Sequence, residues 1–170
     1  ENTCRYLLAK NSRNCDIAVL EGVMGYYDGI STTTEGSAYA LAKVTETPVV
    51  LVINATGASL SLAALIQGFK DFRIDSNIRG AILNNISPMT YAYYKDIIEK
   101  ETGVKLLGYM PKMKGCGFES RHLGLITAEE INNLQVIVDS LAKQAEATID
   151  LKSIIEIAKT APSLDYDAPA

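Results

Sequence analysis

Two carboxylates in a glycine-rich stretch are the residues best suited to chemistry in this sequence. Glu21 directly follows the apolar run at residues 17–20, and Asp28 lies further along the same stretch, which has glycines at positions 22, 25 and 29. Glycine lets the main chain come close to a ligand, and a hard cation such as Mg²⁺ prefers oxygen ligands. We therefore expect Glu21 to bind a hydrated Mg²⁺ that also holds phosphate. A glycine-rich turn with solvated acids fits the spacing equally well.

Polar or turn residues also follow the other apolar runs. Asn54 ends one run, Asn84 and Asn85 end the next, and Pro111 follows a third. Because the carboxyl ends of parallel strands lie at one edge of a sheet, we expect these residues and Glu21 to converge on one crevice. A local turn equally well explains an asparagine such as Asn84 at the end of a strand.

The elements that would position these residues alternate between strands and helices. Apolar runs at residues 17–20, 49–53, 78–83 and 105–109 predict four buried strands. Segments with apolar residues at helical spacing lie before and between these strands. The helices are predicted to begin at the N-terminal caps Ser37, Ser87 and Asp150 and at a capping box of Thr127 with Glu130. This alternation predicts an α/β fold with three layers, in which a parallel sheet has helices on both faces.

Composition excludes several classes of protein. The chain has 170 residues and a net charge of −4, and its basic residues are spread out, which argues against nucleic-acid binding. No apolar run approaches the roughly 20 residues of a membrane span. Three cysteines without CxxC spacing predict reduced thiols and a cytoplasmic location. No orienting motif surrounds any cysteine, which argues against a Cys–His nucleophile pair with His122.

The glycine-rich stretch EGVMGYYDG resembles EGVMGLYDG, a signature of the cobyrinic acid a,c-diamide synthase family. Five more blocks follow in the same order. GSAYALAK is similar to GSTAELAK, PVVLVINATGAS to PVVLVVDASGMS, GAILNNIS to GVILNRVS, LLGYMPK to VLGYLPR, and SRHLGLITAEE to ERHLGLVPAEE. The resemblance runs from about Asp16 to the helix near Ala158. It implies a P-loop NTPase fold like that of dethiobiotin synthetase.

The resemblance also implies roles for individual residues. Glu21 matches the acid that binds Mg²⁺ with the ATP phosphates, and Asp28 matches an acid that acts in the amidation, so we expect it to be catalytic. Asn84 matches an asparagine that binds adenine, and Pro111 would form part of the adenine wall. We expect three further side chains to bind substrate: Tyr26, Arg121 and His122.

The chain departs from the family in several places. Asn54 replaces the Asp of VVDASG, Asn85 replaces a common Arg, and Ser120 replaces the Glu before RHLGL. Nothing in the chain resembles the family's GxxxxGK[ST] phosphate loop or its glutaminase domain. We therefore expect a truncated piece of a longer parent, inactive alone. Residues 1–147 would be a partial ATP-dependent amidoligase domain, and residues 148–170 a terminal helix and linker-like tail.

The function implied for the parent is ATP- and glutamine-dependent amidation of the a and c carboxylates of cobyrinic acid in cobalamin biosynthesis. The carboxylate would become an acyl phosphate, and ammonia from the parent's glutaminase domain would displace phosphate. A sibling enzyme, nickel-sirohydrochlorin a,c-diamide synthase, would use the same signature. A ParA/MinD-like ATPase switch usually has a DxPxG strand end, which is absent. A binding domain that has lost its phosphate loop is a further alternative.

Overall fold

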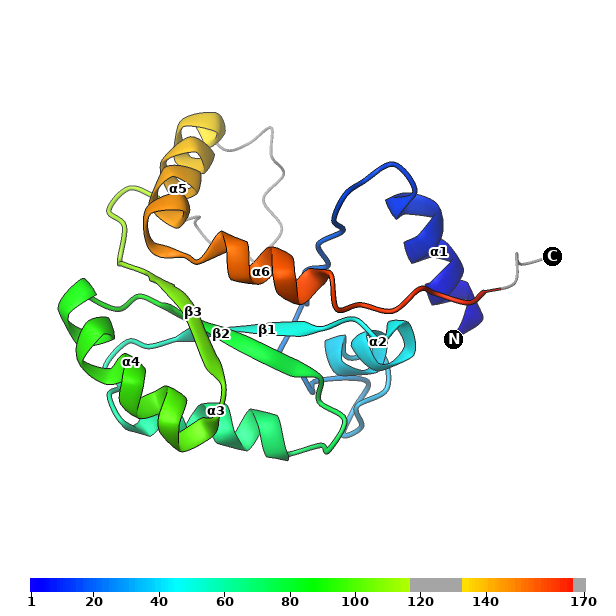
Figure 1. Cartoon of the computed structure of the whole chain (residues 1–170), viewed down its shortest axis with the longest axis horizontal. Helices are drawn as coiled ribbons and strands as arrows, with labels where there is room; N and C mark the ends of the chain where they lie inside the picture. The colour runs from blue at the N-terminus through cyan, green and yellow to red at the C-terminus, as the bar shows by residue number, and fades with distance from the viewer. Residues whose placement is uncertain (117–132, 167–170) are drawn as a thin grey trace.

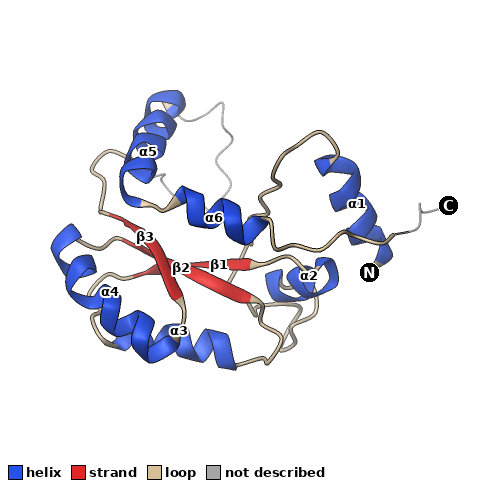
Figure 2. Ribbon diagram, viewed as in Figure 1, coloured by secondary structure: helices blue, strands red, loops and turns tan. Residues whose placement is uncertain are grey.

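The computed structural model describes residues 1–116 and 133–166 (Figure 1). None of the helices in these ranges is long and apolar enough to cross a membrane. Helices and strands alternate from residue 38 to residue 110, as the sequence predicts (Figure 2). In chain order they are α1 (Asn2–Ser12), α2 (Ala38–Thr45), β1 (Val49–Asn54), α3 (Ser61–Asp71), β2 (Ile78–Asn84), α4 (Pro88–Thr102), β3 (Lys105–Met110), α5 (Leu134–Thr148) and α6 (Leu151–Ala158).

The strands form one parallel sheet in the order β1-β2-β3. Asn54 pairs with Asn84, and Asn84 pairs with Met110, so the three carboxyl ends are level with one another. The predicted α/β class and the three strands nearest residues 49–53, 78–83 and 105–109 are confirmed.

The hydrophobic core lies between the sheet and the helices α3 and α4. Ile66 of α3, Leu83 of β2 and Ile98 of α4 are fully buried in it. Burying a side chain of this size contributes about 1.5–3 kcal/mol to stability. The opposite side of the sheet faces α5 and α6, so helices lie on both faces (Figure 1).

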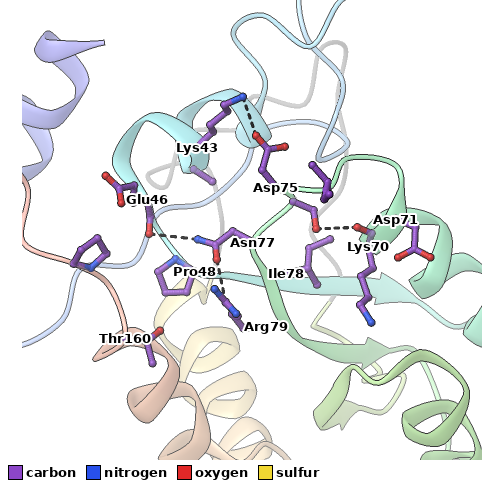
Figure 3. Close-up of a pocket in the computed structure, with 14 residues that line it drawn as sticks. Lys43, Glu46, Pro48, Lys70, Asp71, Asp75, Asn77, Ile78, Arg79 and Thr160 are labelled. Carbon is purple, nitrogen blue, oxygen red and sulfur yellow. Dashed lines mark hydrogen bonds and ion pairs between the residues drawn. The ribbon is translucent and has the colours of Figure 1, made fainter.

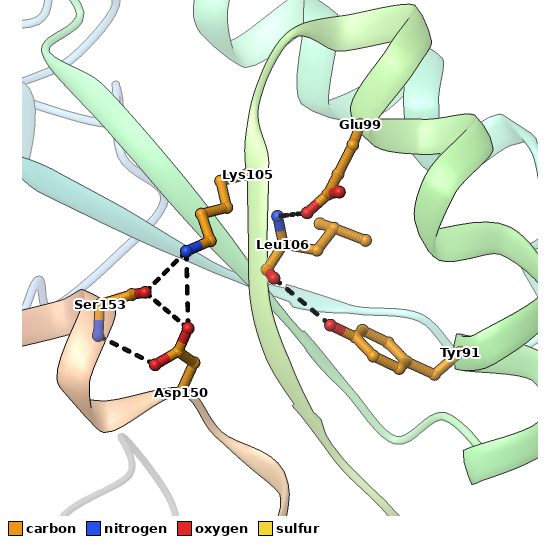
Figure 4. Close-up of polar contacts among 6 residues, drawn as sticks. All are labelled: Tyr91, Glu99, Lys105, Leu106, Asp150 and Ser153. Atoms are coloured by element: carbon orange, nitrogen blue, oxygen red, sulfur yellow. Dashed lines mark hydrogen bonds and ion pairs between the residues drawn. The ribbon is translucent and has the colours of Figure 1, made fainter.

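The segment that leads into α6 is joined to the edge of β3. The amide of Asp150 donates to the carbonyl of Leu107 at 2.7 Å. Lys105 Nζ donates to Ser153 Oγ at 2.6 Å, and Glu99 Oε1 accepts from the amide of Leu106 at 2.8 Å from the α4 side (Figure 4). Strand β3 is therefore held from both of its neighbouring layers.

Side-chain caps begin three helices where the sequence predicts them. Ser37 Oγ accepts from the amide of Ala40 at 3.1 Å and Ser87 Oγ from that of Thr90 at 3.1 Å. Asp150 Oδ1 accepts from the amide of Ser153 at 2.9 Å. Each bond satisfies an amide that the first helical turn leaves unpaired. The predicted capping box of Thr127 and Glu130 lies outside the described residues.

The prediction of a strand at residues 17–20 is wrong. These residues are not part of the sheet, and Val19 has 90% of its surface exposed. An apolar run indicates burial but does not supply the neighbouring strand that its amides and carbonyls need. In the described sheet β1 pairs only with β2, and Val52 of β1 remains 66% exposed.

Candidate functional site

Asparagine side chains form a hydrogen-bonded network at the carboxyl edge of the sheet. Asn54 Oδ1 accepts from the amide of Thr56 at 3.2 Å, from Thr56 Oγ1 at 2.8 Å and from Asn85 Nδ2 at 3.2 Å. Asn85 has a φ of 60°, a left-handed conformation that asparagine tolerates better than most residues. The network therefore links the turn after β1 to the turn after β2.

Asn84 lies at the centre of this edge with its side chain half-buried. Its Oδ1 accepts from the amide of Asn85 at 3.0 Å, which fixes the plane of the side-chain amide. On the β3 side, the amide of Ile86 donates to the carbonyl of Met110 at 3.3 Å, and Pro111 follows directly. The structure therefore brings Asn84 and Pro111 to the same edge, as the sequence predicts.

Glu21 and Asp28 lie in the loop between the two helices α1 and α2, and both side chains are exposed. The amide of Asp28 donates to the carbonyl of Gly25 at 2.9 Å, which closes a tight turn. A Cβ atom at Gly25 would collide with the carboxylate of Asp28. Glycine at position 25 therefore lets the Asp28 carboxylate lie directly against the main chain.

Tyr26 in the same turn is buried, with only 9% of its surface exposed. Its hydroxyl donates to the carbonyl of Ser76, and burial raises the pKa of its phenol. The neighbouring Tyr27 hydroxyl donates to the carbonyl of Phe69 at 2.6 Å. These contacts favour a structural role for Tyr26 over the predicted contact with substrate.

The turn at Tyr26, five residues after Glu21, does not lie at the carboxyl edge, where the predicted crevice would bring Glu21 and Asn84 together. Ser76 lies in the connection that enters β2, whereas Asn84 is the last residue of β2. The turn around Tyr26 is therefore held near the amino end of β2, away from the asparagine network. The expectation depended on a strand at residues 17–20 to direct the glycine-rich loop, and that strand is absent.

An open depression of about 810 Å³ lies at the amino end of the sheet (Figure 3). Lys43 Nζ and Asp75 Oδ2 form an ion pair at 2.8 Å beside it, and Asn77 Nδ2 donates to the carbonyl of Thr47 at 2.8 Å. These polar groups bind one another, and none of the predicted site residues that the structure describes lines the depression. We assign it no catalytic role.

The described side chains fit only one kind of magnesium site. In residues 1–116 and 133–166 no cluster of three or more His, Cys, Asp or Glu residues could hold a metal ion. Proteins usually bind Mg²⁺ through one or two carboxylates, with waters and substrate phosphates completing the shell. The exposed Glu21 fits such a water-rich site, in which phosphate supplies the remaining ligands.

Arg121 and His122, the other two predicted substrate-binding residues, lie outside the described residues, as does Ser120. The three cysteines, Cys4, Cys15 and Cys116, are free thiols. Sequence reasoning missed the bond between Asn54 and Asn85, although both positions were visible as departures from the family signature.

Comparison with known proteins gives a consistent result. The family model described as "AAA domain" matches residues 3–120. Cobyrinate a,c-diamide synthase of Thermoplasma acidophilum is 40% identical over 166 residues, which is 97% of this chain and 37% of that protein. The protein of the same name from Saccharolobus solfataricus is 39% identical over 170 residues, 99% of this chain and 38% of that protein. The chain thus spans little more than a third of these relatives. No solved structure gave a significant match.

Proposed function

We propose that this chain is part of the synthetase section of a cobyrinate a,c-diamide synthase. The chain belongs to the AAA domain family, and it matches cobyrinate a,c-diamide synthases along almost its whole length. The proposed reaction is ATP- and glutamine-dependent amidation of the a and c carboxylates of cobyrinic acid. The observation that carries this proposal is the identity of 40% over 97% of the chain. The six signature blocks, which occur in the family's order, agree with it.

In the proposed reaction a substrate carboxylate attacks the γ-phosphate of ATP, which forms an acyl phosphate and releases ADP. Ammonia then attacks the acyl carbon, the bond to phosphate breaks, and the amide forms. A glutaminase domain of the same parent would supply the ammonia. Mg²⁺, when bound, would neutralise charge on the phosphates, and fixed hydrogen-bond donors would stabilise the transferring group.

We assign the following roles to residues of this chain. Glu21 would bind Mg²⁺, which its exposed carboxylate permits. Asp28 would act on the reacting carboxylate or the acyl phosphate, and its contact with Gly25 keeps the carboxylate close to the main chain of the turn. Asn84 would bind the adenine edge through its oriented amide, with Pro111 beside it. The turn that bears Asp28 is held near the opposite end of β2, so the roles of Asp28 and Asn84 are separate assignments and the two residues do not form one site in this structure.

Two predicted substrate contacts belong to the same proposal. Arg121 and His122 would lie at the rim of the substrate site. A guanidinium group binds carboxylates through two parallel hydrogen bonds, and the corrin precursor carries several carboxylates. A cytoplasmic location, where ATP and glutamine are abundant, is part of the proposal.

Steady-state kinetics of the full-length parent protein test these roles. Glu21→Gln removes the charge a hard cation needs, so activity should fall steeply and recover partly at high Mg²⁺. Asp28→Asn should lower kcat by about 10²-fold, roughly 2.7 kcal/mol, with the KM values for ATP and corrin nearly unchanged. Glu101→Gln, which changes an exposed carboxylate on α4, is the matched control. If Asp28→Asn matches this control, or only raises a KM, Asp28 is a turn residue.

A further inference from the structure

Two tyrosines that depart from the family signature contact each other. The signature EGVMGLYDG has leucine where this chain has Tyr26, and GSTAELAK has alanine where it has Tyr39. The two rings meet edge to face, with centroids 6.0 Å apart. The amide of Tyr39 also donates to the carbonyl of Tyr26 at 2.9 Å. The two departures therefore form one structural unit.

Both hydroxyls bind adjacent residues of the connection between α3 and β2. The Tyr26 hydroxyl donates to the carbonyl of Ser76, and the Tyr39 hydroxyl donates to Asp75 Oδ1 at 2.6 Å. Lys43 Nζ contacts the other oxygen of Asp75 at 2.8 Å (Figure 3). Lys43 and Tyr39 together lower the pKa of Asp75, so Asp75 is ionised at neutral pH. The bond from Tyr39 is therefore charge-assisted.

Tyr27 completes the attachment of the turn. Its ring lies 4.8 Å from that of Tyr26 and 5.2 Å from that of Tyr39, measured between centroids. On the other side it contacts the ring of Phe72 at 4.9 Å. Asp28 is the next residue in the chain. The aromatic contacts therefore hold the main chain immediately before the candidate catalytic carboxylate.

We infer that Tyr26, Tyr39 and Asp75 form a clamp that positions the turn bearing Asp28. Leucine and alanine, the signature residues at the two tyrosine positions, have no hydroxyl with which to reach Asp75 or Ser76. The clamp residues would act through the turn and would not touch substrate, so they are positioning residues. Their effect on catalysis rests on the function proposed above for Asp28, whereas the clamp itself does not.

Hydrogen exchange in the 170-residue chain tests the clamp. Tyr39→Phe keeps the ring and removes only the bond to Asp75, and Asp75→Asn weakens the same bond by removing the charge. Each variant should speed exchange of the Asp28 amide, which bonds to Gly25, by about fivefold or more. Tyr93→Phe, on the exposed face of α4, is the control. Exchange in Tyr39→Phe indistinguishable from this control would overturn the clamp.

Kinetics of the full-length parent test the positioning role. Tyr39→Phe should lower kcat several-fold without changing KM for ATP, and Asp75→Glu should recover more activity than Asp75→Asn. Faster exchange of the Asp28 amide in Tyr39→Phe, together with an unchanged kcat, would overturn the positioning role. If the wild-type parent makes no amide at all, the proposed function fails, while the exchange measurement still decides whether the clamp exists.

Discussion

The bridge between Asn54 and Asn85 can be broken without disturbing the main chain. Asn54→Ala removes an oxygen that accepts three hydrogen bonds, two from Thr56 and one from Asn85. Asn85→Gly removes only the bridging bond, because glycine adopts the φ of 60° found there without strain. The double variant completes a mutant cycle for this one contact.

The structure sets the size of the effect. Both asparagines are exposed, so each lost bond should cost about 0.5 kcal/mol, the lower end of the range for hydrogen bonds. Asn54→Ala should then lower the free energy of unfolding by about 1.5 kcal/mol, or Tm by roughly 3–6 °C. Asn85→Gly should lower it by about 0.5 kcal/mol, and the double variant should cost about 0.5 kcal/mol less than the sum.

Urea and thermal denaturation of the four proteins measure these differences. Asn133→Gly is the matched control, because Asn133 has a φ of 61° and makes no capping bond with its side chain. Strictly additive losses from Asn54→Ala and Asn85→Gly would refute the bridge. The family blocks quoted above have Asp and Arg at these two positions, so Asn54→Asp with Asn85→Arg should keep the turns joined through an ion pair.

Three other perturbations test the fold and its electrostatics. Gly108→Ala should cost at least about 2 kcal/mol in urea denaturation, because the residue has a φ of 134° and a Cβ atom would collide with the carbonyl of Thr148. Ser87→Ala should cost about 1 kcal/mol in the same assay, because it removes the cap of α4. Lys43 and Tyr39 lower the pKa of Asp75 below its usual value near 3.8. The stability that Asp75 contributes through its charge is therefore present above that value and lost as pH falls through the lowered pKa. Asp75→Asn should destabilise the chain fully at neutral pH, and the loss should shrink as the pH falls below about 3.8.

Sequence patterns predicted the parts of the fold that local chemistry determines. The runs that became β1, β2 and β3 are rich in β-branched and aliphatic residues and end in turn residues. Ser37 and Ser87 each stand before a helix, where a short hydroxyl side chain can reach the third amide. Such signals lie within a few residues of one another and need no knowledge of tertiary structure.

The features of the fold and site that the sequence did not predict depend on contacts between distant segments of the chain. Residues 17–20 have the composition of a strand, but composition cannot supply the neighbour that would hydrogen-bond to them. The burial of Tyr26 follows from its bond to Ser76, fifty residues further along the chain. The network at the carboxyl edge was foreseen as a meeting of strand ends, whereas the specific bond from Asn85 to Asn54 required the geometry of both turns.

The most direct test of the proposed function is product analysis of the full-length parent protein with cobyrinic acid, ATP, Mg²⁺ and glutamine. Mass spectrometry should show the a,c-diamide, with one ADP released for each amide formed, and Asp28→Asn should abolish nearly all of it. ATP hydrolysis without amide formation, or amidation of nickel-sirohydrochlorin in place of cobyrinic acid, would contradict the proposal.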